Sequence, residues 1–222
     1  MIYGAIEAGG TKMVCAIGTA DGHLLAEATF ATKDPPETIR ELVAFFQGKK
    51  IKALGIGAFG PVDLNPASPT YGHILDTPKL SWRYFDLAGT LQRALEIPVG
   101  IDTDVNAACL GEMTYGCAQG LKNVIYLTVG TGIGAGIAID GKLVHGMLHP
   151  EAGHILLEPH PEDSFAGICP YHKKCLEGMA SGPAIAERWG AQAADLHENP
   201  KVWELESYYI GQALVNYIMV LS

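Results

Sequence analysis

The sequence contains no apolar run that approaches the roughly 20 residues needed for a membrane-spanning helix. Basic residues are also scarce: 15 Lys and Arg stand against 24 Asp and Glu, a formal net charge of −9. Because nucleic-acid binding depends on clustered Lys and Arg, this balance argues against a nucleic-acid partner. Residues 1–4 lead directly into a strand-like segment, with neither a basic leader nor a cleavage site. We therefore expect a cytoplasmic protein with no membrane partner.

Cysteine is sparse, and the five residues are odd in number, so nothing suggests a disulfide framework. We expect Cys15, Cys109 and Cys117 to be buried as small apolar side chains. The chain also lacks any match to GxxxxGK[ST], which excludes a P-loop as the means of binding phosphate.

Hydrophobic periodicity predicts alternating strands and helices in the first half of the chain. The predicted elements are three strands within residues 2–32, strands at 51–59 and 98–101, and helices at 35–47, 86–95 and 104–115. Residues 60–85 form a long loop rich in Pro, Thr, Gly and Asn. A loop of this length inside a compact domain is usually functional.

The opening pattern of strand, Gly-Thr turn, strand, Asp-Gly turn and strand returns about 120 residues later, at residues 124–144. Such a repeat indicates an internal duplication. It predicts an α/β fold of two domains, residues 1–117 and 118–222, that face each other across a ligand-binding cleft. A helix beginning at Pro200 continues to the last residue with no capping or charged tail. We therefore expect a longer protein from which a C-terminal part is missing.

Two glycine-rich turns are candidates for phosphate binding. Gly9-Gly10-Thr11-Lys12 and Gly130-Thr131-Gly132 each let main-chain N–H groups approach an anion, and each adds a hydroxyl donor. Either turn alone is equally well explained as a simple hairpin. Two turns of the same composition favour a site that holds both ends of a polyphosphate.

The run Asp102-Thr103-Asp104-Val105-Asn106 lies at a predicted strand-to-helix junction. One interpretation is a helix N-cap, which Asp, Thr and Asn commonly form. The other is a general base at a strand end. Position alone leaves both interpretations open.

His154, Cys169, His172 and Cys175 form the pattern H-x14-C-x2-H-x2-C. Four nitrogen and sulfur ligands at this spacing favour a closed structural Zn²⁺ site over a chance collection of Cys and His. The other histidines of the region (His145, His149 and His160) have no matching spacing, and we expect them to lie outside the metal site.

Acidic and aromatic residues accompany these motifs. Glu151 and Glu177 flank the predicted metal loop, and their carboxylates suit paired sugar hydroxyls, although exposed acids often have no special role. Trp82 in the long loop is either a packing aromatic or an edge beside a sugar. Ser181 precedes a predicted helix, either as a simple cap or as part of a phosphate-binding helix N-terminus.

Together these residues resemble the ROK family of bacterial sugar kinases, which has the duplicated, ribonuclease H-like fold of the actin-like ATPases. The resemblance covers nearly the whole chain. Its motifs are Glu7-Ala8-Gly9-Gly10-Thr11-Lys12, Gly57-Ala58-Phe59-Gly60-Pro61-Val62-Asp63, Thr103-Asp104-Val105-Asn106, Gly130-Thr131-Gly132-Ile133-Gly134 and Glu151-Ala152-Gly153-His154. The form Cys169-Pro170-Tyr171-His172-Lys173-Lys174-Cys175 is similar to the zinc-containing fructokinases of Firmicutes. Two positions depart from the family pattern: Glu7 stands where Asp is common, and Thr103 where Asn is common.

The resemblance implies a homodimeric kinase that transfers phosphate from Mg-ATP to a hexose, with fructose as the expected substrate and Asp104 as the base. The implied sugar contacts are Gly60, Pro61, Thr103, Asp104, Glu151, His154 and Glu177. The implied nucleotide contacts are Gly9, Gly10, Thr11, Lys12, Gly130, Thr131 and Gly132, with Glu7 in the outer shell of Mg²⁺. The alternatives are a mannose or glucose kinase of the same family and a sugar-sensing regulator.

Overall fold

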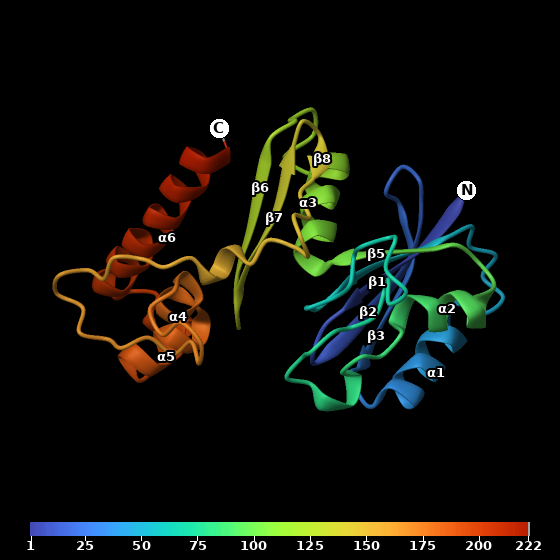
Figure 1. Ribbon diagram of the computed structural model, residues 1–222, viewed down its shortest axis with the longest axis horizontal. Helices are drawn as coiled ribbons and strands as arrows, with labels where there is room; N and C mark the ends of the chain where they lie inside the picture. Colours follow the sequence, from blue (N-terminus) through green and yellow to red (C-terminus); the bar gives the residue numbers. More distant parts are fainter. Residues whose placement is uncertain (222) are drawn as a thin grey trace. The chain divides into compact units, whose positions relative to one another are not determined.

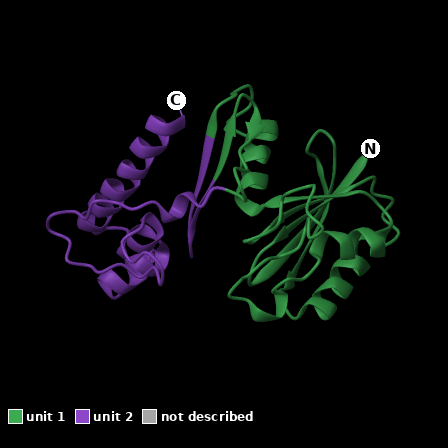
Figure 2. Ribbon diagram, in the orientation of Figure 1, with its two compact units in different colours: residues 1–124, 136–149 green, residues 125–135, 150–222 purple. Residues whose placement is uncertain are grey.

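The structure is a computed structural model that describes residues 1–221. The chain forms two compact units, which Figure 2 colours separately. Unit 1 comprises residues 1–124 and 136–149, and unit 2 comprises residues 125–135 and the chain from residue 150 onward. These bounds differ from those of the domains predicted from the sequence, 1–117 and 118–222. The two predicted domains and the cleft between them stay predictions.

A five-stranded sheet in the order β3-β2-β1-β4-β5 forms the centre of unit 1 (Figure 1). Its strands are β1 (Ile2–Ala8), β2 (Lys12–Thr19), β3 (Leu24–Ala31), β4 (Leu54–Ala58) and β5 (Val99–Thr103). The first three strands form an antiparallel meander, whereas β1, β4 and β5 are parallel to one another. Ala8 lies opposite Ala58, which lies opposite Thr103, so the three parallel strands end level with one another.

Helices cover both faces of this sheet. The helices of unit 1 are α1 (Pro35–Phe46), the short 3-10 helix η1 (Leu80–Trp82), α2 (Leu87–Leu95) and α3 (Asp104–Tyr115). Ile56 of β4 belongs to the core shared with α1 and α2, whereas a Cβ at Gly57 would meet the Cβ of Ala107 in α3 at 2.7 Å. Because successive strand residues point to opposite faces, α3 covers the face opposite to α1 and α2.

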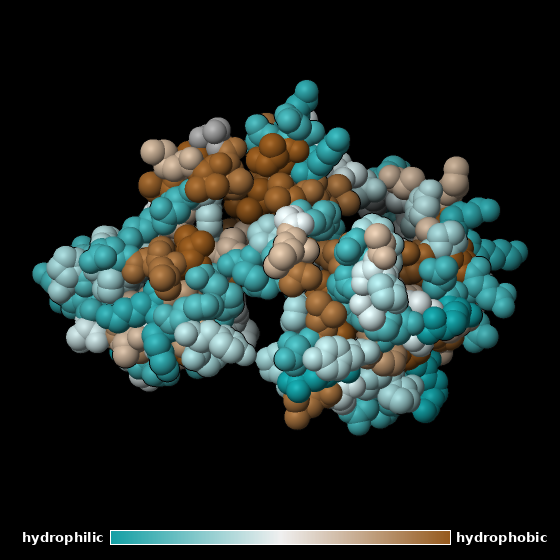
Figure 3. Space-filling view, viewed as in Figure 1, coloured by the Kyte–Doolittle hydropathy of each residue, from teal (hydrophilic) through white to brown (hydrophobic). Residues whose placement is uncertain are grey.

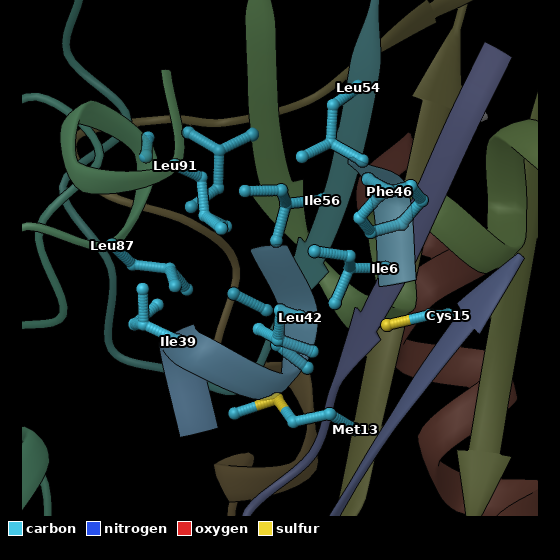
Figure 4. Close-up of a cluster of buried hydrophobic side chains, with 14 of the residues drawn as sticks. Ile6, Met13, Cys15, Ile39, Leu42, Phe46, Leu54, Ile56, Leu87 and Leu91 are labelled. Carbon is cyan, nitrogen blue, oxygen red and sulfur yellow. The ribbon is translucent and has the colours of Figure 1, made fainter. Parts of the chain in front are cut away.

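The hydrophobic core of unit 1 lies between the sheet and the helices α1 and α2. Figure 4 shows Ile6, Leu42, Phe46 and Leu54 converging from β1, α1 and β4. Burial of an aliphatic or aromatic side chain of this size contributes about 1.5–3 kcal/mol. The core thereby fixes the sheet on which the strand ends are aligned.

Trp82 belongs to the same core. It is 0% exposed, packs edge to face against Phe59 and Phe85, and donates its Nε1–H to the carbonyl of Lys33 at 2.8 Å. The interpretation of Trp82 as a packing aromatic is therefore confirmed, and its placement beside a sugar was wrong. Cys117 also departs from expectation: it is exposed after the end of α3, whereas Cys15 and Cys109 are buried as predicted.

The second copy of the strand pattern forms a sheet in the order β6-β7-β8. Its strands are β6 (Val124–Val129), β7 (Ile133–Ile139) and β8 (Lys142–Leu143). The helices of unit 2 are η2 (Ala152–His154), α4 (Leu176–Ala180), α5 (Gly182–Trp189), η3 (Ala193–Leu196) and α6 (Pro200–Leu221). The predicted helix at 104–115 and strands at 124–129 and 133–139 are confirmed residue for residue, but the strand predicted at 51–59 is shorter, at 54–58.

The helix α6 is the longest in the chain and buries one face through Val202, Tyr209 and Ala213. Toward its end it exposes apolar side chains, and hydrophobic atoms gather over this part of the helix in Figure 3. These exposed side chains are Val215, Ile218, Met219 and Val220. Within residues 1–221, no helix combines the length and the hydropathy that crossing a bilayer would require.

A buried charge cluster joins α5 and α6 inside unit 2. The Arg188 guanidinium lies 3.2 Å from an oxygen of Asp163 and 3.5 Å from an oxygen of Glu206, and it stacks over the ring of Phe165 at 4.5 Å. Tyr209 donates its hydroxyl to Asp163 at 2.6 Å. Burial raises the pKa of Glu206 to about 7, the Arg188 charge opposes the shift, and the Asp163 charge adds to it.

The raised pKa of Glu206 predicts a pH-dependent stability. The Glu206 carboxyl keeps its proton to a higher pH in the folded protein than in the unfolded chain, where its pKa is 4.5. The protonated carboxyl therefore makes its full contribution to the unfolding free energy below pH 4.5, and this contribution is lost as the pH rises through about 7. We expect Glu206→Gln to match the wild type at pH 4.5 and to exceed its unfolding free energy by about 2–3 kcal/mol at pH 8. Urea unfolding at both pH values measures this, with the exposed Glu204→Gln as the control. A less stable Gln variant at pH 8 would mean that the Arg188 ion pair outweighs the cost of burial.

Candidate active site

The candidate site in unit 1 lies at the edge of the sheet where its parallel strands end. Because Ala8, Ala58 and Thr103 are level in the register, the segments that follow them leave the sheet side by side. These segments are the Gly9–Lys12 turn, the Phe59–Asp63 segment and the start of α3 at Asp104. Carboxyl ends of parallel strands are where α/β proteins usually bind their ligands.

The Gly9–Lys12 turn is closed by one hydrogen bond, from the Gly9 N–H to the Lys12 carbonyl at 2.9 Å. Within the described residues, the N–H groups of Gly10 and Thr11 donate to no other main-chain group in the turns and loops. A Cβ at Gly10 would meet nothing within 4 Å, so the space above the turn is open. Free N–H groups beside open space are suited to an anion such as a phosphate.

Neighbouring segments hold this turn in place. Thr32 donates its hydroxyl to the Gly9 carbonyl at 2.7 Å, and its N–H to the Thr11 carbonyl at 2.9 Å. The ammonium of Lys79 donates to the Gly10 carbonyl at 2.7 Å. The carbonyls of Gly9, Gly10 and Thr11 thus each accept a hydrogen bond from a neighbouring segment, which fixes the conformation of the turn.

The second segment carries a cis peptide bond between Gly60 and Pro61. The imidazole of His149 lies at 3.4 Å from the position that a Cβ on Gly60 would occupy. The carboxylate of Asp63 is 7% exposed and accepts from the Thr70 hydroxyl at 2.7 Å and from the Asn65 N–H at 3.0 Å. Asp63 therefore stabilises the loop conformation, in which Gly60 is exposed and the Pro61 carbonyl accepts from the Leu75 N–H at 2.8 Å.

At the start of α3 the N-cap interpretation is confirmed for Thr103, whereas the general base stays a prediction. Thr103 is 4% exposed, and its hydroxyl accepts from the Asn106 N–H at 3.2 Å, so it is the N-cap. Asp102 accepts from the Asn106 amide at 2.8 Å, from the Thr103 N–H at 2.8 Å and from the His145 ring at 2.7 Å. Both side chains are occupied in building the junction. The sugar contact expected of Thr103 stays a prediction.

Asp104 is the acid of the junction that faces solvent. Its carboxylate accepts from the Val105 N–H at 2.8 Å, and within residues 1–221 no side chain bonds to it, which leaves lone pairs for a ligand. Partial desolvation raises the pKa of Asp104 above its ordinary range, the Val105 N–H opposes this shift, and the negative charge of Glu7 adds to it. A carboxylate with a raised pKa and an open face has the properties of a general base.

Unit 2 contains the second glycine-rich turn, between β6 and β7. Its N–H at Gly130 donates to the Gly132 carbonyl at 2.9 Å, and the Gly130 carbonyl accepts from the Gly182 N–H at the start of α5 at 2.8 Å. The Glu177 carboxylate accepts from the Ile133 N–H at 3.0 Å. A Cβ at Gly132 would meet the same Glu177 oxygen at 2.7 Å, so a larger residue there would displace this carboxylate.

The four predicted metal ligands converge in unit 2. The ligand atoms of His154, Cys169, His172 and Cys175 all lie within 4.8 Å of one another. The Cys175 sulfur lies 3.5 Å from the His154 ring nitrogen, and the Cys169 sulfur lies 3.8 Å from that of His172 and 3.9 Å from that of His154. A tetrahedral ion bound at ordinary Zn–S and Zn–N lengths would separate sulfur from nitrogen by about 3.6 Å. The donor set therefore fits a metal ion, and the other histidines of the region lie outside the cluster as predicted.

The segment before this cluster is packed tightly against β7. A Cβ at Gly153 would collide with the Ile133 carbonyl, and the Ala152 carbonyl accepts the Tyr217 hydroxyl at 2.7 Å. The Glu151 carbonyl accepts from the His154 N–H at 2.9 Å. Glu151 is thus one 3-10 turn before a metal ligand, and Glu177 follows another, Cys175, by two residues.

Sequence reasoning missed two features of the unit 1 site. One is the Lys79 contact with Gly10, which joins residues 69 positions apart. The other is the pair of Asp102 and His145, beside which a cavity of about 480 Å³ opens between the loops at 64–71 and 145–148. Lys79 lies in the long loop at 60–85, which also carries Asp63, Asp76 and Arg83, so its charge alone did not mark it.

Comparisons with known proteins agree with this geometry. A family model described as the ROK family matches residues 3–221. A protein of Bacillus subtilis (strain 168) is 52% identical over 221 residues, which cover 100% of this chain and 74% of the relative. The fructokinase of Lactococcus lactis subsp. cremoris is 43% identical over 99% of this chain and 75% of its own length.

Among solved structures, a ROK family glucokinase from Streptomyces griseus in complex with glucose and AMPPNP is 28% identical, with a TM-score of 0.68. The alignment covers 90% of this chain and 63% of that structure. The α/β fold of the actin-like ATPases predicted from the sequence is thereby confirmed. This chain spans about three quarters of the length of the curated relatives it matches.

Proposed function

We propose, on the premise that this chain belongs to the ROK family, that it transfers phosphate from ATP to D-fructose to give fructose 6-phosphate. The observation that carries the proposal is the solvent-facing carboxylate of Asp104 at the end of the parallel strands, with a raised pKa. The fructokinase of Lactococcus lactis, at 43% identity over 99% of the chain, supports the choice of fructose.

In the proposed reaction, the oxygen of the sugar C6 hydroxyl forms a bond to the terminal phosphorus of ATP. The bond between that phosphorus and the bridging oxygen breaks, and ADP leaves. Asp104 accepts the hydroxyl proton. Positioning and charge neutralisation supply most of the rate enhancement in reactions of this class.

We also propose binding roles for the residues predicted from the sequence. Around the sugar we propose the backbone at Gly60 and Pro61, with Thr103, Glu151, His154 and Glu177. The phosphates are proposed to bind the turns Gly9-Gly10-Thr11-Lys12 and Gly130-Thr131-Gly132. Glu7 lies in β1, the strand that leads into the first turn, and we assign it to the outer shell of Mg²⁺, which when bound would neutralise phosphate charge.

We further propose that the ion of the His154, Cys169, His172 and Cys175 cluster is Zn²⁺, because two thiolates and two imidazoles suit zinc in a closed tetrahedral site. Its role is structural, since the cluster offers four protein ligands. The proposed protein is a cytoplasmic homodimer without a nucleic-acid or membrane partner.

A second candidate substrate is glucose, or its epimer mannose, which the likeness to the glucokinase crystallised with glucose favours. The choice between hexoses is tested by a coupled ADP-release assay on the full-length protein with Mg-ATP and fructose, mannose, glucose and N-acetylmannosamine. We expect the largest kcat/KM on fructose. A larger kcat/KM on glucose or mannose would replace the substrate but keep the chemistry, and no ADP release with any of the sugars would reject the kinase assignment.

A further inference from the structure

The Gly9–Lys12 turn has a cation beside it that comes from a distant loop. The ammonium of Lys79 donates to the Gly10 carbonyl at 2.7 Å and lies 3.3 Å from the carbonyl of Thr32. An ammonium has three N–H donors. Two of them point at these carbonyls, and the third is left for a ligand.

The loop that carries Lys79 is held rigidly in unit 1. Trp82, three residues on, is fully buried and bonds to the Lys33 carbonyl. Thr77, two residues before, is 3% exposed, and its carbonyl accepts from the Arg83 guanidinium at 3.3 Å. Lys79 thus projects from between two anchored residues. Its ammonium is fixed at the turn, which limits the entropy lost when it binds a ligand.

Lys79 also has no counter-charge. Within residues 1–221, neither Lys79 nor Lys12 forms an ion pair with an acidic group, although the chain carries a net charge of −9. The nearby Lys33, by contrast, is paired with Glu37 at 2.6 Å and with Glu41 at 3.0 Å. A half-buried cation that contacts only neutral carbonyls is incompletely compensated, so an anion beside it gains attraction without displacing a carboxylate.

We propose that Lys79 binds the terminal phosphate of a nucleotide held at the Gly9–Lys12 turn, through the ammonium N–H that the two carbonyls leave unused. This role rests on the proposed kinase function and adds to it a residue from outside the phosphate motif. Lys79 neutralises the charge of the transferred group and exchanges no proton with it. Lys79 lies in the same loop, residues 60–85, as the proposed sugar contacts Gly60 and Pro61. The proposed phosphate-binding charge and these sugar contacts therefore belong to one segment of the chain.

Three substitutions distinguish a role of the Lys79 charge in phosphate binding from a clasp, that is, a purely structural hydrogen bond from Lys79 to the Gly10 carbonyl. Lys79→Met removes both the charge and the hydrogen bond, Lys79→Gln keeps a donor for the Gly10 carbonyl but removes the charge, and Lys79→Arg keeps the charge. Lys33→Met is the matched control, because the Lys33 charge is already neutralised by Glu37 and Glu41. Calorimetric titration of the full-length protein with Mg-ATP, Mg-ADP and fructose is combined with steady-state turnover and the melting temperature.

We expect the Met and Gln variants to bind ATP about tenfold more weakly and to lose about 100-fold in kcat, the size of effect seen when one preorganised donor to a developing charge is removed. Affinity for ADP and fructose should change by less than about threefold, because the terminal phosphate is absent from both. The Arg variant should recover most of the activity, and Lys33→Met should behave like the wild type.

Two results would overturn this role. One is a Gln variant with wild-type ATP affinity and turnover, which would make Lys79 a clasp for the loop. The other is equal weakening of ATP and ADP, which would place the charge away from the terminal phosphate. A lowered melting temperature in the Met variant alone, with Gln normal in turnover, likewise favours the clasp. These results differ from a failure of the proposed kinase function itself. In that case the wild-type protein would bind no ATP, or would release no ADP with any hexose.

Discussion

The variant Asp104→Asn is expected to lower turnover about 1,000-fold while its affinity for the sugar changes by less than a few fold. General-base catalysis typically contributes a factor of about 100 to 10,000, and Asn cannot accept the hydroxyl proton. Asn is isosteric with Asp, and its carbonyl oxygen can still accept from the Val105 N–H. The helix start should therefore fold as in the wild type, so the loss is confined to the chemical step.

The measurement is steady-state turnover with Mg-ATP and fructose, with sugar affinity from calorimetry. Asp140→Asn is a suitable control, because Asp140 lies in the β7–β8 turn with a φ of 50°, a conformation that Asn also tolerates. The raised pKa of Asp104 also predicts that wild-type kcat/KM falls as the pH drops through a value above the ordinary aspartate range. An Asn variant with near-normal turnover would exclude Asp104 as the base.

Removal of the metal ligand Cys175 is expected to have the largest effect on stability. Cys175 is 0% exposed, caps α4 by accepting from the Gly178 N–H, and lies 3.5 Å from the His154 ring. Structural zinc contributes on the order of 10 kcal/mol to the folding of small domains that depend on it. We expect Cys175→Ser to lose the bound metal and to lower the melting temperature by more than about 10 °C, since one kcal/mol shifts the melting temperature of a domain of this size by about 2–4 °C.

The control for this experiment is Cys117→Ser, because Cys117 is exposed and lies outside the ligand cluster. Metal content is measured by mass spectrometry and stability by thermal unfolding, with and without a chelator. Cys117→Ser should retain one metal per chain and melt as the wild type does. If chelation strips the metal and the melting temperature does not move, the cluster has no structural role and this expectation is wrong.

Local features of the fold were predictable because their signals are local. The helix predicted at 86–95 begins with Asp86 as its N-cap, which accepts from the Gly89 N–H, and Asp is a common residue at this position. The helix from Asp104 and the hairpin strands on either side of Gly130 were predicted from caps, turns and periodicity alone. The metal ligands were predictable for a related reason, since four Cys and His residues lie within 22 positions and few structures other than a metal site explain that spacing.

The remaining features of the site depend on contacts between residues far apart in the sequence. No local pattern places the Lys79 ammonium on the Gly10 carbonyl, or the Glu177 carboxylate on the N–H of Ile133, 44 residues away. Trp82 illustrates the same limit. Its residue type fits either a sugar platform or a core, and only the packing against Phe59 and Phe85 decides between them.

The bond from the Ile133 N–H to Glu177 joins two sites that the sequence separates. Glu177 lies two residues after Cys175, so the position of its carboxylate depends on the metal loop, and the Gly130–Gly132 turn depends in turn on that carboxylate. Affinities linked through a shared element are coupled reciprocally. If occupation of the metal site orders the turn and tightens nucleotide binding by some factor, the bound nucleotide must tighten metal binding by the same factor. The cell's supply of one ligand would then set the apparent affinity for the other.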